Sequence, residues 1–228
     1  WGYLTAGVFQ NQEQINAWTS KTQATDMSKY YFGGTAKPGD IIYVDKNGDG
    51  VVTAADYTVI GNPNPDFTWG FNTNFSYKQL SLAIAVVGVQ GKDIFNANLN
   101  REDQMAGGIY NIRQDAWNGR WQGEGTSNTF PSATSTQKTN QMSDRLVEDA
   151  SFARLANVTL SYLIKFGKNF PLKDTKIFVT GNNLLTLTKY RGFDPEVDSF
   201  GGSSMIVGVD NNSYPSSRSL IFGLNINF

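Results

Sequence analysis

The chain has 228 residues with 19 basic and 20 acidic side chains, and no basic run provides the electrostatic surface of a nucleic-acid-binding protein. Cysteine and histidine are both absent, which excludes disulfide frameworks, thiolate catalysis, Ser-His-Asp triads and the usual zinc sites. Aromatic residues make up 13% of the chain and no stretch approaches the roughly 20 apolar residues of a membrane-spanning helix, so the composition favours an all-β fold.

The first 66 residues show little strand periodicity. Residues 12–18 predict a short helix that begins near Asn11, with Glu13 favourable in its first turn. Because the chain starts at Trp1 and not at a methionine, we expect it to be a piece of a longer protein.

An EF-hand-like calcium loop is predicted at residues 45–56. The candidate ligands follow the spacing of such a loop and are Asp45, Asn47, Asp49, Val51 through its carbonyl, Thr53 and Asp56. Gly50 stands where the loop has to turn sharply. Asp56 departs from the pattern because an EF-hand has a glutamate there, although dockerin-type calcium loops tolerate the shorter side chain. The alternative is a surface turn rich in Asp and Asn that holds no ion.

Five strands are predicted in the rest of the chain, at residues 67–77, from residue 80 to about 86, and at about 153–166, 176–186 and 219–228. In the first strand, aromatic residues occupy every second position except Thr73 and so share one face. Only Lys78 and Gln79 separate it from the second strand, which predicts a tight hairpin. Such alternation occurs in a soluble β-sandwich, which the composition alone favours, and also in a transmembrane barrel.

The connections between these strands alternate in length. They are short at 78–79, long at about 91–151, short at 167–174 and long at about 187–216. Outer-membrane barrels have short periplasmic turns and long extracellular loops. If the last residue lies in the periplasm, both short turns lie there too, and the long loops lie outside the cell. We therefore predict that residues 1–66 are an extracellular loop region and that residues 67–228 are the last five strands of a large antiparallel transmembrane β-barrel.

Several polar and aromatic side chains are candidates for contacts with cargo. The polar faces of the predicted strands carry five asparagines, which would line the lumen of a barrel: Asn72, Asn74, Asn157, Asn225 and Asn227. They could bind a passing glycan, hold water or contact a plug, so they are not assigned to substrate. Tyr110, Trp117 and Trp121 in the first long loop could stack on sugar rings or pack within the loop.

Two pairs of acidic residues have spacings that invite comparison with a glycosidase. They are Asp194 with Glu196, and Glu148 with Asp149. Acidic residues so close together in loops are usually solvated, and nothing in the sequence indicates a carboxyl group held in an apolar pocket. The sequence therefore predicts that the protein is not an enzyme.

Three stretches of the chain resemble the SusC/RagA-like TonB-linked outer-membrane receptors. The first joins GDIIYVDKNGDG at 39–50 to IGNPNPDF at 60–67, followed by an aromatic strand. The second joins GNNLLTLTKY at 181–190 to GFDPEV at 192–197, and the third runs from YPSSRS at 214–219 to Phe228. These stretches extend from residue 39 to the end of the chain, and in combination they are specific.

The resemblance implies a plugged barrel of about 22 strands in the outer membrane of a Gram-negative bacterium. It also implies a SusD-like surface lipoprotein as partner, energy from TonB through an N-terminal region that is absent here, and import of oligosaccharides, with peptides as cargo in some members. Phe228, with apolar residues at every second position before it, is the type of signal that the outer-membrane assembly machinery reads. The rival hypothesis is a soluble calcium-dependent carbohydrate-binding or dockerin-like surface module.

Overall fold

The structure is a computed structural model. It describes residues 1–22, 35–103, 111–135, 141–167, 170–201, 203 and 206–227. The chain divides into two units, each made of three segments. The first, called the loop unit, contains Trp1–Asn62, Ile94–Glu148 and Asp198–Asn212. The second, called the sheet unit, contains Pro63–Asp93, Asp149–Val197 and Ser213–Phe228. The loop unit therefore joins the region before the first long strand to the middle of both long connections.

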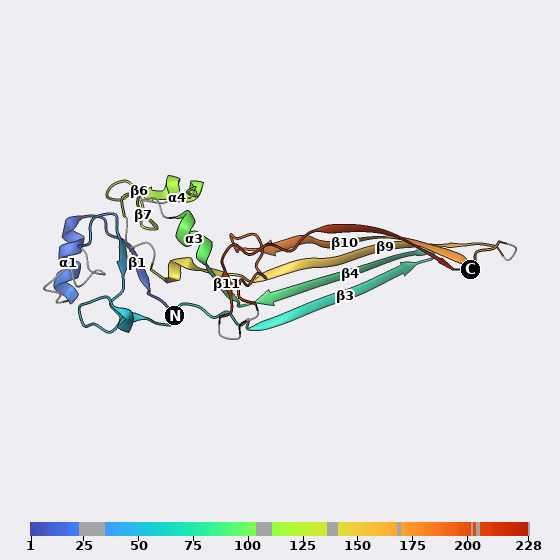
Figure 1. Cartoon of the computed structure of the whole chain (residues 1–228), viewed down its shortest axis with the longest axis horizontal. Coiled ribbons are helices and arrows are strands. Elements are labelled where there is room, and N and C mark those ends of the chain that lie inside the picture. Colours follow the sequence, from blue (N-terminus) through green and yellow to red (C-terminus); the bar gives the residue numbers. More distant parts are fainter. Residues whose placement is uncertain are drawn as a thin grey trace. The chain divides into compact units, whose positions relative to one another are not determined.

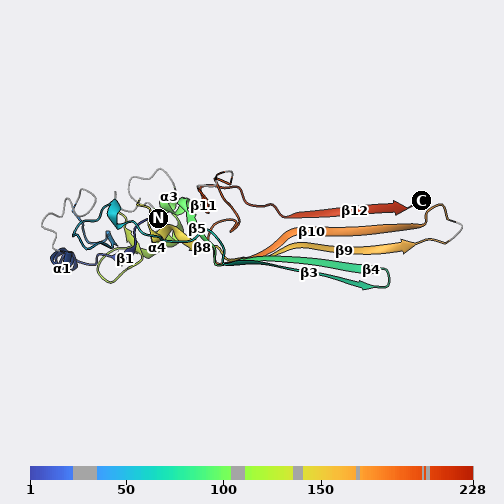
Figure 2. The ribbon, with the colours of Figure 1, turned by 90° about the horizontal axis from the view of Figure 1, so that it is seen from below.

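The sheet unit is built on one antiparallel sheet of five strands. These are β3 (Phe67–Tyr77), β4 (Leu80–Gln90), β9 (Phe152–Lys165), β10 (Asp174–Thr188) and β12 (Ser219–Asn227). They lie side by side in chain order, each paired with the next (Figure 1; from below in Figure 2). All five predicted strands are confirmed, and β10 extends two residues beyond the predicted bounds at each end.

The sheet is open within the residues that the structure describes. Its edges are β3 and β12, which do not pair with each other. The five strands therefore do not close a barrel by themselves. No helix in the described part of the chain is long and apolar enough to cross a membrane. Phe228, whose role in assembly was predicted, lies outside the described residues.

The register of the strands separates an apolar face from a polar face. On the apolar face Phe71 lies opposite Val86, and Phe75 lies opposite Leu82. The hairpin between β3 and β4 turns at Lys78, which has a positive φ of 54°, as the tight two-residue connections of twisted strands require. The alternation of side chains in the first strand and the tight hairpin after it, both predicted from the sequence, are confirmed.

Two glycines of the sheet lie under aromatic rings of a neighbouring strand. A Cβ added to Gly88 would lie 2.1 Å from the Trp69 ring, and one added to Gly223 would lie 2.0 Å from the Phe178 ring. Both pairs are directly opposite each other in the register. Each glycine therefore makes room for its partner's ring.

The loop unit has its own apolar core. Strand β1 (Thr5–Val8) pairs with β2 (Ile41–Tyr43), and helix α1 (Gln12–Thr22) follows β1. The buried core residues are Tyr3, Phe9, Ile15, Ala36, Ile41, Ile42, Tyr43 and Val52. The predicted helix is confirmed and is longer than expected. Its start is fixed by Asn11, whose side-chain oxygen accepts a hydrogen bond from the Gln14 N–H at 2.9 Å.

The long connections contain short elements. A three-stranded sheet joins β5 (Asp93–Asn96), β8 (Val147–Asp149) and β11 (Val209–Asp210), so it combines residues from both connections. The remaining elements are α3 (Ala97–Glu102), α4 (Gln114–Gly119), β6 (Arg120–Trp121), β7 (Phe130–Ser132) and the 3-10 turns η1 (Ala54–Asp56) and η2 (Asp144–Leu146).

Candidate functional site

The polar face of the sheet carries a set of side-chain hydrogen bonds that crosses three strands. Asn157 Nδ2 donates to Asn182 Oδ1 at 2.9 Å, and Asn182 Nδ2 donates to Ser219 Oγ at 3.0 Å. In the next row the hydroxyl groups of Thr159 and Thr180 lie 2.8 Å apart, and Thr159 Oγ1 also donates to Asn157 Oδ1 at 3.1 Å. The predicted position of Asn157 on a polar face is confirmed, and it belongs to a hydrogen-bonded network.

The asparagines of β3 lie on the same face beside small residues. Asn72 pairs with Ala85 and Asn74 with Ala83, and these residues line a hollow together with Asn157. Their predicted place on the polar face is therefore confirmed.

The other two predicted asparagines lie at the far end of the same face, near the short turns. Asn225 lies opposite Lys176, and Asn227 Nδ2 donates to Asp174 Oδ1 at 2.6 Å. This end of the polar face carries charged residues, whereas the middle of the polar face carries none.

A β-bulge in β9 turns Arg154 to the polar face. Ala85 and Val86, which are consecutive in β4, pair with Asn157 and Leu155 of β9. Ala156 therefore has no partner in β4 and is an extra residue on β9. The bulge shifts the alternation of side chains by one position. Arg154 therefore faces the polar side, whereas a regular strand would turn it to the apolar side.

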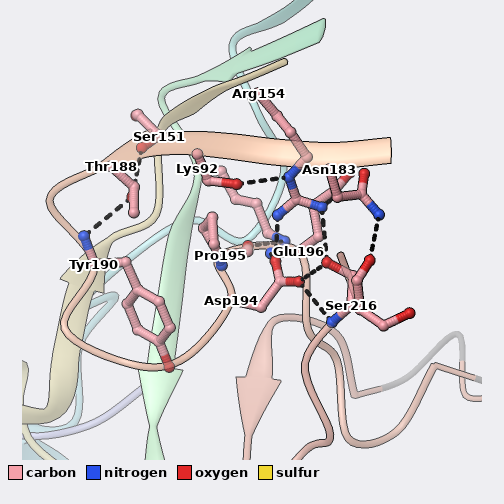
Figure 3. A network of polar contacts seen from close by, with 12 residues as sticks. Lys92, Ser151, Arg154, Asn183, Thr188, Tyr190, Asp194, Pro195, Glu196 and Ser216 are labelled. Carbon is pink, nitrogen blue, oxygen red and sulfur yellow. Dashed lines mark hydrogen bonds and ion pairs between the residues drawn. The ribbon is translucent and has the colours of Figure 1, made fainter. Parts of the chain in front are cut away.

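The guanidinium of Arg154 is the centre of a group that we call the Arg154 network (Figure 3). Its Nη2 donates to Asp194 at 2.6 Å, and its Nη1 pairs with Glu196 and donates to Ser216 Oγ at 3.1 Å. Its Nε donates to Thr186 Oγ1 at 3.0 Å. The planar guanidinium therefore binds one neighbouring strand and both stems of the long connection between β10 and β12.

Asp194 is a buried carboxylate, which corrects the expectation that this residue is solvated. Its side chain is 5% exposed, against 48% for that of Glu196. Burial acts to raise its pKa, but hydrogen bonds from Ser216, the Glu196 N–H and Arg154 outweigh burial and lower the pKa to about 2. The residue is therefore ionised at neutral pH and is held as the partner of Arg154.

Further bonds hold the same end of the sheet (Figure 3). Lys92 Nζ donates to the Pro195 carbonyl at 3.2 Å, and Thr188 Oγ1 donates to the Ser151 carbonyl at 2.9 Å. The second acidic pair is also engaged, since Glu148 accepts from Asn96 Nδ2 at 2.8 Å and Asp149 accepts from the Ser151 N–H at 2.9 Å.

Sequence reasoning did not find Arg154. One signal was available, because Leu155 and Ala156 are adjacent apolar residues that interrupt the alternation of the strand, and such an interruption is typical of a bulge. The partners of Arg154 lie 32 positions away (Thr186) to 62 positions away (Ser216) in the chain. Nothing in the local pattern indicates them.

The predicted calcium loop is a compact turn in which the acidic side chains accept hydrogen bonds from backbone N–H groups. Asp45 accepts from Gly48 at 2.7 Å and from Gly50 at 2.9 Å, and Gly50 has the expected positive φ, 86°. Asn47 accepts from the Asp49 N–H at 2.9 Å, and Asp49 accepts from the Val51 N–H at 2.9 Å.

Asp56, the last predicted ligand, points into the loop unit and is 1% exposed. It accepts hydrogen bonds from the N–H groups of Lys46 at 2.9 Å, Asn47 at 3.3 Å and Thr53 at 2.8 Å. Thr53 in turn caps η1 by accepting from the Ala55 N–H at 3.2 Å. No group of three or more acidic side chains among the described residues has an arrangement that would hold a metal. The hydrogen bonds account for the turn, and calcium binding stays a prediction.

Two of the aromatic candidates, Trp117 and Trp121, lie in the loop unit. Trp121 Nε1 donates to Gln10 Oε1 at 3.3 Å, so this side chain packs within the unit. Trp117 is 46% exposed, and the guanidinium of Arg120 lies 3.7 Å from its ring centroid. Tyr110 lies outside the described residues.

The chain is similar to several TonB-dependent receptors. It is 33% identical to TonB-dependent receptor P3 of Formosa agariphila over 86% of the chain and 20% of that protein. It is 30% identical to TonB-dependent receptor P26 of the same organism over 100% of the chain and 22% of that protein. It is 26% identical to TonB-dependent receptor SusC of Bacteroides thetaiotaomicron over 84% of the chain and 18% of that protein. No family model matches the chain.

Solved structures of the RagAB peptide transporter contain the same fold. The whole chain superposes on 22% of one chain of that transporter with a TM-score of 0.70 and 24% sequence identity. The same values describe the match to the RagAB peptide importer in its open-open state.

The open sheet with long connections at one end, together with these relatives, defines a part of a TonB-dependent receptor. The chain belongs to the SusC-like family of these receptors and is a partial chain, which confirms the resemblance seen in the sequence. It spans about a fifth of the length of the curated relatives it matches.

Proposed function

We propose that the chain is part of an outer-membrane receptor of a Gram-negative bacterium that imports large nutrients with energy supplied by TonB. The observation that carries the proposal is the contrast between the two faces of the sheet. Phe71 and Phe222 on one face are 56% and 79% exposed, whereas the other face is polar and hydrogen-bonded across its strands. A transmembrane barrel presents such faces to lipid and to its lumen.

Two topological features support the orientation of this sheet. The short connections, at 78–79 and between β9 and β10, lie at one end of the strands, and the long connections lie at the other. In an outer-membrane barrel the short end is periplasmic and the long end is extracellular. In this proposal the loop unit, with residues 45–56, is therefore outside the cell, where these residues bind one structural calcium ion.

Oligosaccharides are the proposed cargo, with peptides as the alternative. Three adjacent rows of the polar face, from Asn72 to Ser219, from Asn74 to Ile221 and from Ser76 to Gly223, contain no charged side chain. Amide and hydroxyl groups are suited to sugar hydroxyl groups, because both donate and accept hydrogen bonds. The peptide alternative is supported by the likeness to RagAB, a peptide importer.

Two partners belong to this proposal. A SusD-like surface lipoprotein would cover the extracellular mouth, as the relation to SusC supports. TonB would act through an N-terminal region outside this chain. Import needs no covalent step, and the relatives are named as receptors, which supports the prediction that the protein is not an enzyme.

Uptake by the full-length receptor tests the proposal. Cells that express it would be given a mixture of fluorescein-labelled oligosaccharides and, separately, labelled peptides, with cells that lack TonB as the control. We expect uptake of at least one class that disappears without TonB and falls without the lipoprotein. Equal uptake in all three strains for both classes would reject the import function.

The placement of the faces is tested by two adjacent substitutions on β4. Ile84→Arg puts a charge on the apolar face and should destabilise the barrel by about 2–4 kcal/mol if the residue lies near the bilayer midplane. Ala83→Arg puts the same charge on the polar face and should cost much less. The temperature at which the full-length barrel unfolds in detergent measures both effects. If the two variants unfold alike, the apolar face does not contact lipid.

A further inference from the structure

The Arg154 network lies at the stems of the two long connections within the sheet unit. The chain leaves the sheet unit after Asp93 and Val197, and it returns at Asp149 and Ser213. Every member of the network lies in the sheet unit, and the hydrogen bonds between its members are therefore contacts within that unit.

The two stems of the second long connection are bound to each other and to Arg154. Asp194, in the outgoing stem, accepts hydrogen bonds from both the N–H, at 2.9 Å, and the hydroxyl of Ser216, in the returning stem. The register of β10 with β9 shifts between Asn182 and Leu185. Asn183 Nδ2, within this irregularity, donates to the Ser217 carbonyl at 3.1 Å. Arg154 completes the group by binding Asp194, Glu196 and Ser216 from β9 (Figure 3).

The two stems of the first long connection join the same group. The Ala150 N–H, where the chain returns, donates to the carbonyl of Lys92, where it leaves, at 2.8 Å. The side chain of Lys92 then donates to the Pro195 carbonyl at 3.2 Å. A continuous set of bonds therefore connects all four stems. Arg154, in the middle strand of the sheet, binds both stems of the second connection directly. Lys92 joins the stems of the first connection to them.

Holding the loop stems with a buried ion pair costs desolvation free energy. The side chains of Arg154 and Asp194 are 4% and 5% exposed, and removing both charges from water offsets much of their attraction. The forked guanidinium supplies direction in return, because its fixed N–H groups bind several acceptors in one geometry. Such a centre is suited to setting the course of the stems more than to adding stability.

We propose that Arg154 is a positioning residue for import: it fixes the stems of the second long connection, to which Lys92 joins the stems of the first, and so sets the arrangement of the extracellular loops that capture cargo. This inference rests on the proposed import function. It predicts that loss of the guanidinium loosens the loops and weakens cargo capture while the barrel itself assembles normally.

The test uses the full-length receptor in cells. Arg154→Met removes the charge and keeps an unbranched apolar stem. We expect normal levels of folded receptor, cleavage of the long loops by external proteinase K that is about tenfold faster or more, and a raised apparent KM for uptake of the labelled probe that the wild type imports. Arg154→Lys should be intermediate, because an ammonium cannot bridge two carboxylates and two hydroxyl groups in a fixed fork.

Arg218→Met is the matched control, because it removes an exposed arginine outside the network near the start of β12. It should behave as the wild type. If Arg154→Met assembles and shows wild-type cleavage and KM, the proposal is wrong. If Arg154→Met does not assemble, the double variant Arg154→Met/Asp194→Leu leaves no buried charge in the network. Wild-type cleavage and KM in the double variant would equally overturn the proposal.

The two proposals can fail separately. If the wild-type receptor shows no TonB-dependent uptake, the import function fails, and the positioning role of Arg154 in import fails with it. Loop cleavage still reports in that case whether Arg154 anchors the stems. If uptake is present but cleavage and KM do not change in the Arg154 variants, only the positioning role is rejected.

Discussion

Two of the buried aspartates, Asp56 in the loop unit and Asp194 in the sheet unit, are held in different ways. Asp56 in the loop unit is 1% exposed and accepts hydrogen bonds from three backbone N–H groups that all lie within ten residues of it. Asp194 in the sheet unit is 4% exposed and is bound by a guanidinium that lies 40 positions away in the chain. One carboxylate organises a local turn, and the other joins distant segments.

The difference shows what each kind of burial depends on. Backbone N–H groups of a turn are available wherever the turn forms, so Asp56 needs only the short segment around it. Asp194 needs the register of three strands and the bulge at Ala156, because these bring Arg154 to the same face. Disturbing the sheet should therefore release Asp194, whereas the turn around Asp56 should survive.

The same substitution at both sites is the strongest test of this difference, and the larger effect is expected at Asp194. Asp194→Asn removes the charge that Arg154 requires and should cost about 3–5 kcal/mol of local stability, as for other broken buried ion pairs. Hydrogen exchange of the Ser216 and Glu196 amides in the full-length receptor measures the loss. Unchanged protection of both amides would mean that the carboxylate is not the centre of the network.

Asp56→Asn should have the next largest effect. The amide group presents a donor toward a backbone donor, and a mismatch of this kind costs about 1–3 kcal/mol. Faster exchange of the Lys46 and Thr53 amides should report the change, while the Ser216 amide stays as in the wild type. A loss of protection at Ser216 as well would show that the two aspartates are coupled.

Calcium should have a smaller effect, confined to the loop unit. A site with a Kd of about 10⁻⁴ to 10⁻³ M would stabilise the loop by about 0.4–1.4 kcal/mol at about 1 mM calcium. The cleavage rate of residues 45–56 with calcium and with a chelator measures it. Asp49→Ala should remove the difference, and Asp115→Ala, an exposed acidic residue of the same unit, should preserve it. If the wild type does not respond, backbone hydrogen bonds alone order the turn.

The smallest expected effect is that of pH on the Arg154 network. The pKa of Asp194 is lowered from 3.8 to about 2, so the stability that its ionisation contributes is complete above about pH 4 and is lost as the pH falls toward 2. Protection of the Ser216 amide, corrected for the intrinsic dependence of exchange on pH, should therefore not change between about pH 5 and pH 8. A decrease within that interval would show that Asp194 is not ionised as described.

The strands could be predicted closely because the alternation of apolar and polar side chains along each strand is a periodic and local pattern. The alternation from Phe67 to Tyr77 and the two-residue turn after it determine register, hairpin and face together. The predicted turn at Gly50 has the same local character. Placement relative to lipid depends on the rest of the barrel, so it stays a prediction.

The Arg154 network could not be predicted because it depends on an irregularity. A single extra residue, Ala156, decides which face Arg154 takes, and a period-2 pattern assumes that no such residue is present. The acidic side chains Asp194 and Glu196 were visible in the sequence, but a carboxylate that will be buried cannot be told from a solvated one until its cation is known.

The close contacts between rings and glycines in the sheet have a consequence for how related sequences change over time. A side chain at Gly88 would displace the ring of Trp69, and one at Gly223 would displace the ring of Phe178. The glycine of each pair is therefore not free to vary while its partner stays aromatic. In an alignment of SusC-like receptors, a small residue in place of the aromatic should accompany replacement of its glycine, so that the two columns covary although about twenty to forty-five positions separate them in the chain.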